Sequence, residues 1–381
     1  METGRFQRLN LGKIKTPCYL VDETLIEKNL KILQKVKGRT GCKILLALKG
    51  FSMFSTFPLI RKYLDGVCAS SPNEARLGCE EFRKEVHVFA PAYSEDDIKE
   101  LLKTSSTIVF NSFGQLEKYR KKVRGKVEIG LRVNPEYSEI KYPLYDPCAK
   151  GSRMGVLLEE LEKHSLKGID GLHFHALCEQ NADVLQRVLE RFEEKFGKYL
   201  NGMKWVNFGG GHHISREDYD VDMLCRVIND FKKKYKVKVY LEPGEAIALN
   251  TGVLIAKVLD IVHNEADIAI LDTSAEAHMP DTLAMPYKAK IIGAAEPGTY
   301  RYNYRLAGAT CLAGDVIGDY SFPKKLKAGD KLMFTDMAHY TMVKNTTFNG
   351  VRLPSIAILK KNGKVKVVKE FGYADFRNRL S

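Results

Sequence analysis

The sequence of 381 residues lacks long apolar runs, and no stretch approaches the roughly 20 apolar residues needed to span a bilayer. Its first residues, Met-Glu-Thr-Gly-Arg-Phe-Gln, also lack the continuous apolar core of a secretory signal. These two absences predict a cytoplasmic protein. Low-complexity segments and flexible linkers are missing as well. The chain is too long for a single core of usual size, and its length predicts one large domain with a smaller one.

Paired cysteines are the next absence. No Cys-x-x-Cys pair and no regular spacing occur among the eight cysteines, which lie at positions 18, 42, 68, 79, 148, 178, 225 and 311. Reduced thiols are therefore expected. The histidine pairs His173/His175 and His212/His213 lack a further Cys, Asp or His at ligand spacing, so no metal is predicted.

Positive charge is abundant, with Lys and Arg exceeding Asp and Glu by 13, but the lysines are not gathered into one patch. They recur in helical segments such as Phe-Lys-Lys-Lys-Tyr at 231–235, without interleaved aromatic residues. This spread is typical of solvated helix faces, and nucleic-acid binding is not predicted.

Short β-rich apolar runs alternate with helical patterns through the first two thirds of the chain. Segments 74–82 and 182–192 have helical spacing between such runs. Strands alternating with helices predict a parallel sheet, and eight repeats favour a closed (β/α)8 TIM-like barrel over an open doubly wound sheet. We assign this α/β barrel to residues 38–270. Its strands are expected at 44–48, 66–69, 86–89, 107–110, 127–133, 171–176, 205–208 and 237–241.

A second, all-β domain is predicted from residues 1–37 and 271–381. Runs at 331–334, 355–359 and 365–368 are separated by turn signals, without long helical segments between them. The run at 16–21 precedes a helical pattern at 23–36, and we expect this early strand to join the later sheet.

Polar residues follow the predicted barrel strands. In a parallel barrel the carboxyl ends of all strands face one mouth, so these residues should converge there. They are Lys49, Ser70, Asn111, Arg132, Asn134, His175, Gly209 to Gly211, and Glu242.

Four of these groups match the needs of pyridoxal phosphate. The glycine triplet could turn sharply and aim N–H groups at a phosphate, with Glu242 on the ring nitrogen. Lys49 could form an imine with the aldehyde, and His175 could stack on the ring. The same residues have simpler interpretations: a glycine-rich strand-to-helix turn, and a lysine whose stem lies along a strand end.

The ordered tracts resemble the fold-type III pyridoxal-phosphate decarboxylases, the alanine racemase-like fold that includes ornithine and diaminopimelate decarboxylases. The resemblance covers about residues 16 to 375. It rests on Ala-Leu-Lys, Leu-Arg-Val-Asn-Pro, His-Phe-His, Asn-Phe-Gly-Gly-Gly, Glu-Pro-Gly, Gly-Ala-Thr-Cys-Leu-Ala-Gly-Asp, His-Tyr-Thr and Thr-Phe-Asn-Gly. Within the family, the tracts Trp-Val-Asn-Phe-Gly-Gly-Gly-His-His-Ile and Glu-Pro-Gly-Glu-Ala are similar to those of members that act on carboxylated polyamines.

This resemblance implies roles for barrel residues. Lys49 would carry the cofactor, Arg132 would support it, His175 would stack on its ring, and Gly209 to Gly211 would bind its phosphate. Glu242 would keep the ring nitrogen protonated and so favour decarboxylation.

The resemblance also implies a homodimer with shared active sites. Cys311 and Asp315 would enter the partner's site, where Cys311 would protonate the carbon that has lost carbon dioxide. Tyr340 would contact the cofactor phosphate.

Three positions depart from the family pattern. Cys178 replaces a phosphate-binding serine, and a thiol is the poorer donor. Val67 replaces an acidic residue of ornithine decarboxylases. Glu245 stands where relatives commonly have arginine, so we expect Glu245, together with Asp281, to bind amino groups of an elongated polyamine.

The sequence therefore predicts decarboxylation of carboxynorspermidine or carboxyspermidine. The enzyme alternative is a diaminopimelate or other basic amino-acid decarboxylase. Glu245 argues against diaminopimelate, which carries a second carboxylate. The non-enzyme alternative is a carrier of pyridoxal phosphate, which would not need the Cys311 tract.

Overall fold

The computed structural model describes residues 4–285 and 287–381 and divides into two compact units. One unit is Glu27–Ile247, and the other combines Met1–Ile26 with Ala248–Ser381. The boundaries expected from the sequence were 37/38 and 270/271. The boundaries in the structure lie earlier in the chain, because α2 (Glu23–Thr40) continues into the barrel unit and because the long strand β10 (Gly252–Asn264) belongs to the sheet.

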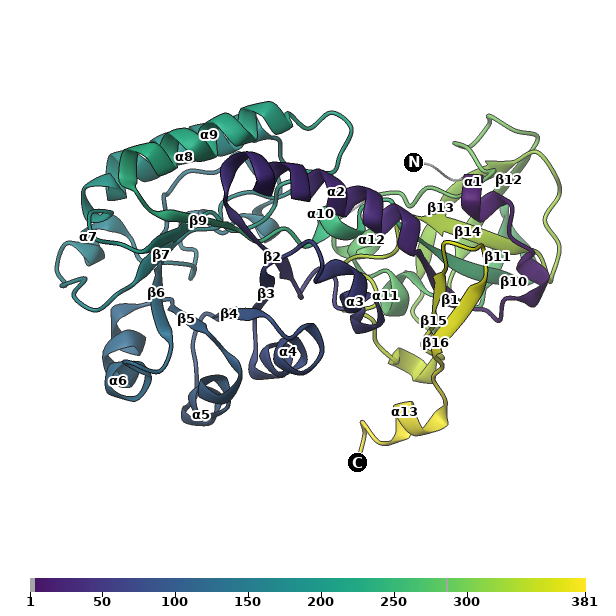
Figure 1. Ribbon diagram of the computed structural model, residues 1–381. Helices are drawn as coiled ribbons and strands as arrows, with labels where there is room; N and C mark the ends of the chain where they lie inside the picture. Colours follow the sequence, from purple (N-terminus) through teal and green to yellow (C-terminus); the bar gives the residue numbers. More distant parts are fainter. Residues whose placement is uncertain (1–3, 286) are drawn as a thin grey trace. The chain divides into compact units, whose positions relative to one another are not determined.

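The barrel unit contains the predicted closed barrel of eight parallel strands (Figure 1). All eight apolar runs are confirmed as strands, and the pairing of β9 with β2 closes the barrel. Most of their residues are buried, as expected for strands covered on both faces. The strands are β2 (Lys43–Ala47), β3 (Gly66–Ala69), β4 (Glu85–Phe89), β5 (Thr107–Phe110), β6 (Glu128–Arg132), β7 (Gly171–His173), β8 (Trp205–Asn207) and β9 (Lys238–Leu241).

Helices connect successive strands on the outside of the barrel. Ser94 caps α5 in a capping box with Asp97, and Asp220 caps α9 through the N–H of Met223. Figure 1 shows α8 beside α9, where Phe192 faces Phe231 at 6.3 Å between ring centres. The helices are α3 (Phe57–Ile60), α4 (Pro72–Leu77), the π-helix η3 (Gly78–Phe82), α5 (Glu95–Thr104), α6 (Phe113–Val123), α7 (Leu158–Leu161), α8 (Ala182–Phe196), α9 (Val221–Tyr235) and α10 (Glu245–Ala248).

The second unit is a mixed sheet. The predicted early strand, β1 (Cys18–Asp22), pairs with β10 and with β15 (Ser355–Leu359), which confirms that the N-terminal segment joins the later sheet. The predicted strands β14 (Lys331–Thr335) and β16 (Val365–Lys369) are also present. The sequence did not identify β10, β11 (Ala266–Leu271), β12 (Tyr302–Ala307) or β13 (Val316–Phe322). Short helices in this unit include α11 (Ala275–His278), α12 (Asp281–Ala284) and α13 (Tyr373–Arg377).

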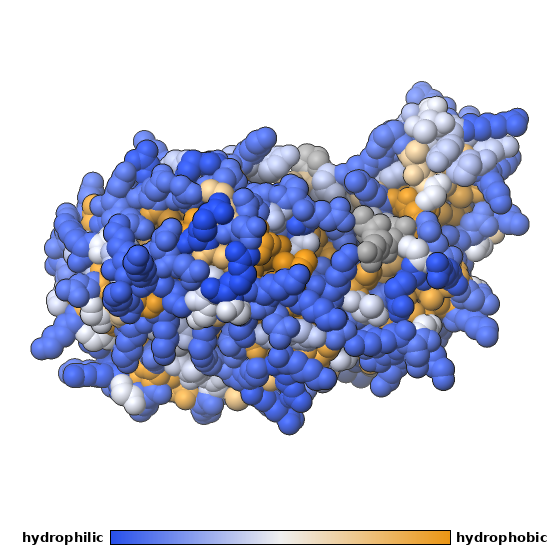
Figure 2. All heavy atoms as spheres, turned by 45° about the horizontal axis from the view of Figure 1, so that its top comes forward, coloured by the Kyte–Doolittle hydropathy of each residue, from blue (hydrophilic) through white to orange (hydrophobic). Residues whose placement is uncertain are grey.

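Polar residues dominate the surface. Figure 2 shows hydrophilic residues over most of the visible face, with apolar residues reaching the surface in separate small areas. Among the described residues, no helix is both long enough and apolar enough to cross a membrane.

A single tryptophan fills one layer of the barrel interior. Gly130, Gly171 and Trp205 lie in register on three neighbouring strands, β6, β7 and β8. A Cβ on Gly171 would lie 2.2 Å from the indole ring, and one on Gly130 would lie 2.6 Å from it. The indole N–H donates to Glu128 at 2.8 Å. The two glycines therefore provide the space that the indole occupies.

We predict that Gly171→Ala destabilises the protein by about 1–3 kcal/mol, because the added methyl group must displace a buried indole. Gly114→Ala is the matched control, since Gly114 lies in α6 and a methyl group added there would meet no other part of the chain within 4 Å. Chemical denaturation of both variants gives the free energies of unfolding. If Gly171→Ala unfolds no more easily than Gly114→Ala, the packing explanation is wrong.

Candidate active site

The predicted cofactor residues of the barrel gather at one mouth. Arg132 ends β6, Lys49 lies two residues beyond β2, and His175 lies two residues beyond β7. Glu242 directly follows β9, and its N–H donates to the carbonyl oxygen of Gly209 at 2.8 Å. The parallel barrel brings these residues to the same mouth from distant parts of the sequence.

Glu242 is the best-defined group of the site. Its Oε1 accepts a 2.6 Å hydrogen bond from Nδ2 of Asn207, and its Oε2 lies 3.4 Å from Nε2 of His173. Oδ1 of Asn207 accepts a 2.9 Å hydrogen bond from the N–H of Gly209. One buried amide therefore links the Glu242 carboxylate to the glycine triplet.

This environment keeps Glu242 ionised. Burial by itself would raise its pKa, but His173 and the amide of Asn207 stabilise the carboxylate and lower the pKa to about 2. Burial lowers the pKa of His173, so its imidazole is neutral near pH 7 and offers an N–H. Glu242 can therefore hold a proton on a basic ring nitrogen.

His175 is held in one tautomer. Its Nδ1 accepts a 2.9 Å hydrogen bond from the N–H of Gly210, which requires that the ring proton lie on Nε2. Burial and the positive charges of Lys49 and Arg132 lower the pKa of His175 well below its usual value. The result is a neutral, oriented imidazole, suited to stacking on a flat ring.

Arg132 is buried and supports the mouth. Its guanidinium lies 4.5 Å from the ring centre of Phe89 and donates to the carbonyl oxygen of His175 at 3.2 Å. Burial lowers its pKa to about 10, so the group stays charged at neutral pH. Arg132 thereby supports the backbone that carries His175.

Lys49 differs in one respect from the sequence-based prediction, which held its amine against the barrel interior. The residue is exposed in the single chain, because β2 ends at Ala47 and the chain turns before Lys49. Its charge still acts on the pKa of His173, His175 and Glu74, so the amine lies within electrostatic range of the site.

The glycine triplet is more tightly packed than the predicted phosphate cradle. A Cβ on Gly209 would lie 2.5 Å from the carbonyl oxygen of Phe174, and one on Gly211 would lie 1.9 Å from that of Leu177. The N–H groups of Gly209 and Gly210 are already bonded to Asn207 and His175. Within the described residues, the N–H of Gly211 is the member of the triplet left to donate to an anion.

Glu245 begins α10 and lies beside the loop that follows β8. Its Oε2 is 2.9 Å from Nε2 of the buried His213. Cys178 occupies the loop after β7, where its N–H donates to the side chain of Gln180 at 3.3 Å.

The other predicted site residues belong to the second unit. Cys311 is exposed, and its N–H donates to Asn349 at 2.7 Å. Asp315 is buried and accepts from the hydroxyl of Thr310 at 2.6 Å and from the N–H of Ala275 at 2.7 Å. Asp315 therefore orders the loop that carries Cys311.

Tyr340 and Asp281 also lie in this unit. Tyr340 has a φ of 48°, a left-handed backbone that is uncommon for a non-glycine residue, and its ring packs edge-on against His339. Asp281 begins α12 and forms an ion pair with Lys344. Its carboxylate is thus engaged by a cation of the same unit.

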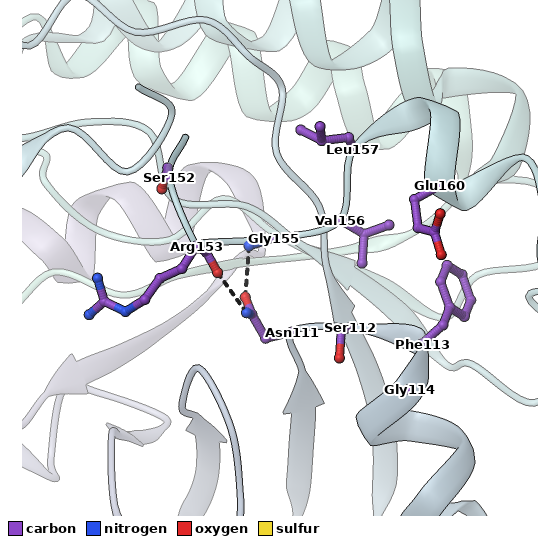
Figure 3. A pocket seen from close by; sticks show the side chains of 10 residues that line it. All are labelled: Asn111, Ser112, Phe113, Gly114, Ser152, Arg153, Gly155, Val156, Leu157 and Glu160. Carbon is purple, nitrogen blue, oxygen red and sulfur yellow. Dashed lines mark hydrogen bonds between the residues drawn. The ribbon is translucent and has the colours of Figure 1, made fainter. Parts of the chain in front are cut away.

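A separate cavity of about 330 Å³ opens in the barrel unit beside β5 (Figure 3). Asn111 organises its wall, donating to the carbonyl oxygen of Arg153 at 2.8 Å and accepting from the N–H of Gly155 at 2.7 Å. None of the predicted cofactor residues lines this cavity. Its lining residues are Asn111, Ser112, Phe113, Gly114, Ser152, Arg153, Gly155, Val156, Leu157 and Glu160.

The sequence did not assign a role to Asn207, and it considered His173 only as a metal ligand. Both residues contact Glu242. Position was the available signal: Asn207 lies two residues before the glycine triplet, and His173 shares a strand face with His175.

A parallel β/α barrel places an amine, an ionised carboxylate and a neutral imidazole at one mouth. This combination is typical of enzymes whose cofactor carries an aldehyde and a basic ring nitrogen. Comparison with known proteins gives the family. Residues 18–338 match the family described as "Pyridoxal-dependent decarboxylase, C-terminal sheet domain". The chain therefore belongs to the pyridoxal-dependent decarboxylases.

Relatives of this family match the chain over nearly its whole length. Carboxynorspermidine/carboxyspermidine decarboxylase from Campylobacter jejuni is 47% identical, covering 96% of this chain and 99% of that protein. Carboxyaminopropylagmatine decarboxylase from Synechocystis is 45% identical, covering 97% and 96%.

Solved structures agree with this assignment. Carboxynorspermidine decarboxylase of Campylobacter jejuni, complexed with norspermidine, matches with a TM-score of 0.91 and 46% identity, covering 96% of this chain and 100% of that one. Diaminopimelate decarboxylase from Helicobacter pylori, at 20% identity and a TM-score of 0.83, covers 97% and 98% and shares the fold.

Pyridoxal phosphate is the cofactor of this family, and the residues present fit it. Lys49 would supply the amine, His175 would offer a flat neutral ring, and Glu242 would be an ionised partner for the ring nitrogen. When bound, the cofactor accepts the electron pair released as the substrate loses carbon dioxide.

We predict that Asn207→Asp lowers kcat by at least about tenfold near neutral pH. The substitution places a second carboxylate against Glu242, and two adjacent carboxylates raise one pKa of the pair. Their shared proton is lost only as the pH rises, so the acid limb of the kcat profile should move to higher pH.

Asn201→Asp is the matched control, because Asn201 is exposed in the loop before β8. It should leave the pH profile unchanged. An Asn207→Asp profile that overlays that of the unmodified protein would contradict the proposed role of Asn207.

Proposed function

We propose that this chain decarboxylates carboxynorspermidine to norspermidine, or carboxyspermidine to spermidine, in polyamine biosynthesis. The main support is 47% identity to a carboxynorspermidine/carboxyspermidine decarboxylase over 99% of that protein. The structure of a relative complexed with norspermidine supports the same substrate class.

A second candidate substrate is carboxyaminopropylagmatine, because a relative named for it is 45% identical over 96% of its length. All three candidate acids combine a carboxylate with an elongated, positively charged tail. The agmatine derivative ends in a guanidinium group, whereas the other two end in a primary amine.

Glu245 supports a cationic tail. The resemblance described above implies an arginine at this position in the family pattern, whereas this chain places a carboxylate beside His213. A carboxylate attracts an ammonium group and repels the second carboxylate of diaminopimelate. We therefore assign Glu245 to the substrate's amino groups.

In this proposal the carboxylates of Asp281 and Asp315 are engaged by groups of their own unit. Asp281 forms an ion pair with Lys344, and Asp315 accepts hydrogen bonds from Thr310 in its own loop and from Ala275 in α11. Asp315 would position Cys311 by ordering residues 310–315.

In the proposed reaction, Lys49 would hold the cofactor through its amine, and the substrate amine would replace the Lys49 amine on the cofactor, leaving Lys49 as a free amine. Glu242 holds the ring-nitrogen proton while the carboxylate leaves. Cys311, contributed by the partner subunit of a homodimer, then donates a proton to the carbon, and Tyr340 contacts the cofactor phosphate. The cytoplasmic location stays a prediction from the sequence.

The holoenzyme should release carbon dioxide from carboxynorspermidine or carboxyspermidine with a kcat/KM at least about a hundredfold above that for diaminopimelate, a preference of about 2.7 kcal/mol. Carboxyaminopropylagmatine is tested in parallel. Preferential release from diaminopimelate would contradict the proposed function, and preference for the agmatine derivative would select the second candidate.

The shared site predicts complementation between inactive variants. Lys49→Ala and Cys311→Ala should each be nearly inactive. When their subunits exchange at random, about half of the dimers are mixed and each mixed dimer has one intact site, so the mixture should reach roughly a quarter of the wild-type activity. Activity after mixing is the measurement, with each variant incubated alone as the control. No recovery despite demonstrated subunit exchange would place Cys311 and Lys49 in the same subunit's site.

A further inference from the structure

Three neighbouring barrel strands each deliver one ionisable side chain to the same place. Glu179 follows β7, His213 follows β8 and Glu245 follows β9. One ligand atom from each of the three lies within 4.8 Å of the other two. We propose that the two carboxylates form a subsite for an ammonium group of the polyamine tail, with His213 as a positioning residue. This inference rests on the proposed function.

The loops that carry the three residues are tied together. Nη1 of Arg216 lies 3.3 Å from both the carbonyl oxygen of Glu179 and Nδ1 of His213. The hydroxyl of Ser215 donates to the carbonyl oxygen of Ala246, in α10, at 2.5 Å. The cluster is therefore built into the mouth by hydrogen bonds between three loops.

Two carboxylates this close together repel each other, and a cation between them removes that cost. His213 gives a second, independent indication of a ligand. It is 5% exposed, and its Nε2 points toward Glu245 without an aligned hydrogen bond to any described residue. A buried polar atom without a hydrogen bond is costly, so its position beside two acids is best explained by a site that works with a ligand bound.

The tautomer of His213 favours ammonium over a metal ion. Arginine can only donate, so Nδ1 of His213 accepts from Arg216 and the neutral ring carries its proton on Nε2. That nitrogen then lacks the lone pair a metal would need. Its N–H instead faces Glu245 and can orient the carboxylate.

The sequence predicted that Glu245 and Asp281 together bind the amino groups of the substrate. The barrel unit itself provides Glu179 as a second carboxylate, because the loops after β7 and β8 run side by side through the bridge between Gln180 and His212. Glu179 is exposed, so it would contact the end of the tail nearest to solvent.

The test compares two ligands by calorimetry with the holoenzyme. Norspermidine carries both terminal amines, whereas N-propyl-1,3-diaminopropane lacks one of them. Glu179→Gln and Glu245→Gln should each weaken norspermidine binding about tenfold or more, the loss of a charge-assisted hydrogen bond, and should leave the analogue's Kd within about twofold. Glu190→Gln, an exposed change of the same charge on α8, should alter neither Kd.

Several outcomes would overturn the subsite. They are unchanged norspermidine binding in Glu179→Gln and Glu245→Gln, equal weakening of both ligands, or loss of bound cofactor absorbance in these variants. Tight stoichiometric binding of Mn²⁺ or Zn²⁺ that disappears in Glu179→Gln, with norspermidine binding unchanged, would assign the cluster to a metal.

Failure of the proposed function has a different signature. In that case the unmodified holoenzyme would neither bind norspermidine nor release carbon dioxide from the polyamine acids. A wild-type enzyme that does both, while Glu179→Gln and Glu245→Gln behave normally, would reject the subsite alone.

Discussion

The site depends on keeping one buried carboxylate charged. An ionised group removed from water is expensive unless polar groups replace its hydration, and Glu242 obtains this stabilisation from the hydrogen bond of Asn207 and from the nearby imidazole of His173. The same amide of Asn207 also binds the N–H of Gly209, so the charge of the carboxylate and the path of the glycine triplet are coupled. A change that disturbs either group should disturb both.

The close packing of the strand ends explains why glycines are needed there. Each Cβ added at Gly209, Gly210 or Gly211 would strike a carbonyl oxygen of a neighbouring loop. The triplet thus serves first to let three chain segments approach, and of its three N–H groups that of Gly211 is left for an anion, as far as the described residues show. The simpler interpretation of the triplet as a tight turn therefore fits the packing, whereas phosphate binding stays a prediction that concerns the N–H of Gly211.

The sequence predicted the barrel well because each strand is a short apolar run, and the residues after these runs had to meet at one mouth. It did not predict the exposure of Lys49, since periodicity does not reveal that the chain turns after Ala47. It missed β10 and assigned its residues to the barrel, because an apolar run does not reveal its partners, and β10 pairs with β1, β11 and β14 of the sheet. The proximity of Glu179 to Glu245 depends on loop geometry and was equally invisible.

The overall charge of the chain bears little on its choice of substrate. An excess of 13 positive charges repels a polyamine at long range, yet screening confines surface charges to about 8–10 Å in physiological salt. The proposed cofactor partner and the acidic cluster are close in the chain, since Glu242 directly follows β9 and Glu245 comes three residues later. In the proposed function Glu242 would serve the decarboxylation itself, whereas Glu245 lies beside a different loop and contacts His213. One barrel can therefore change its substrate at the loops after β7, β8 and β9 while the carboxylate that supports decarboxylation stays in place.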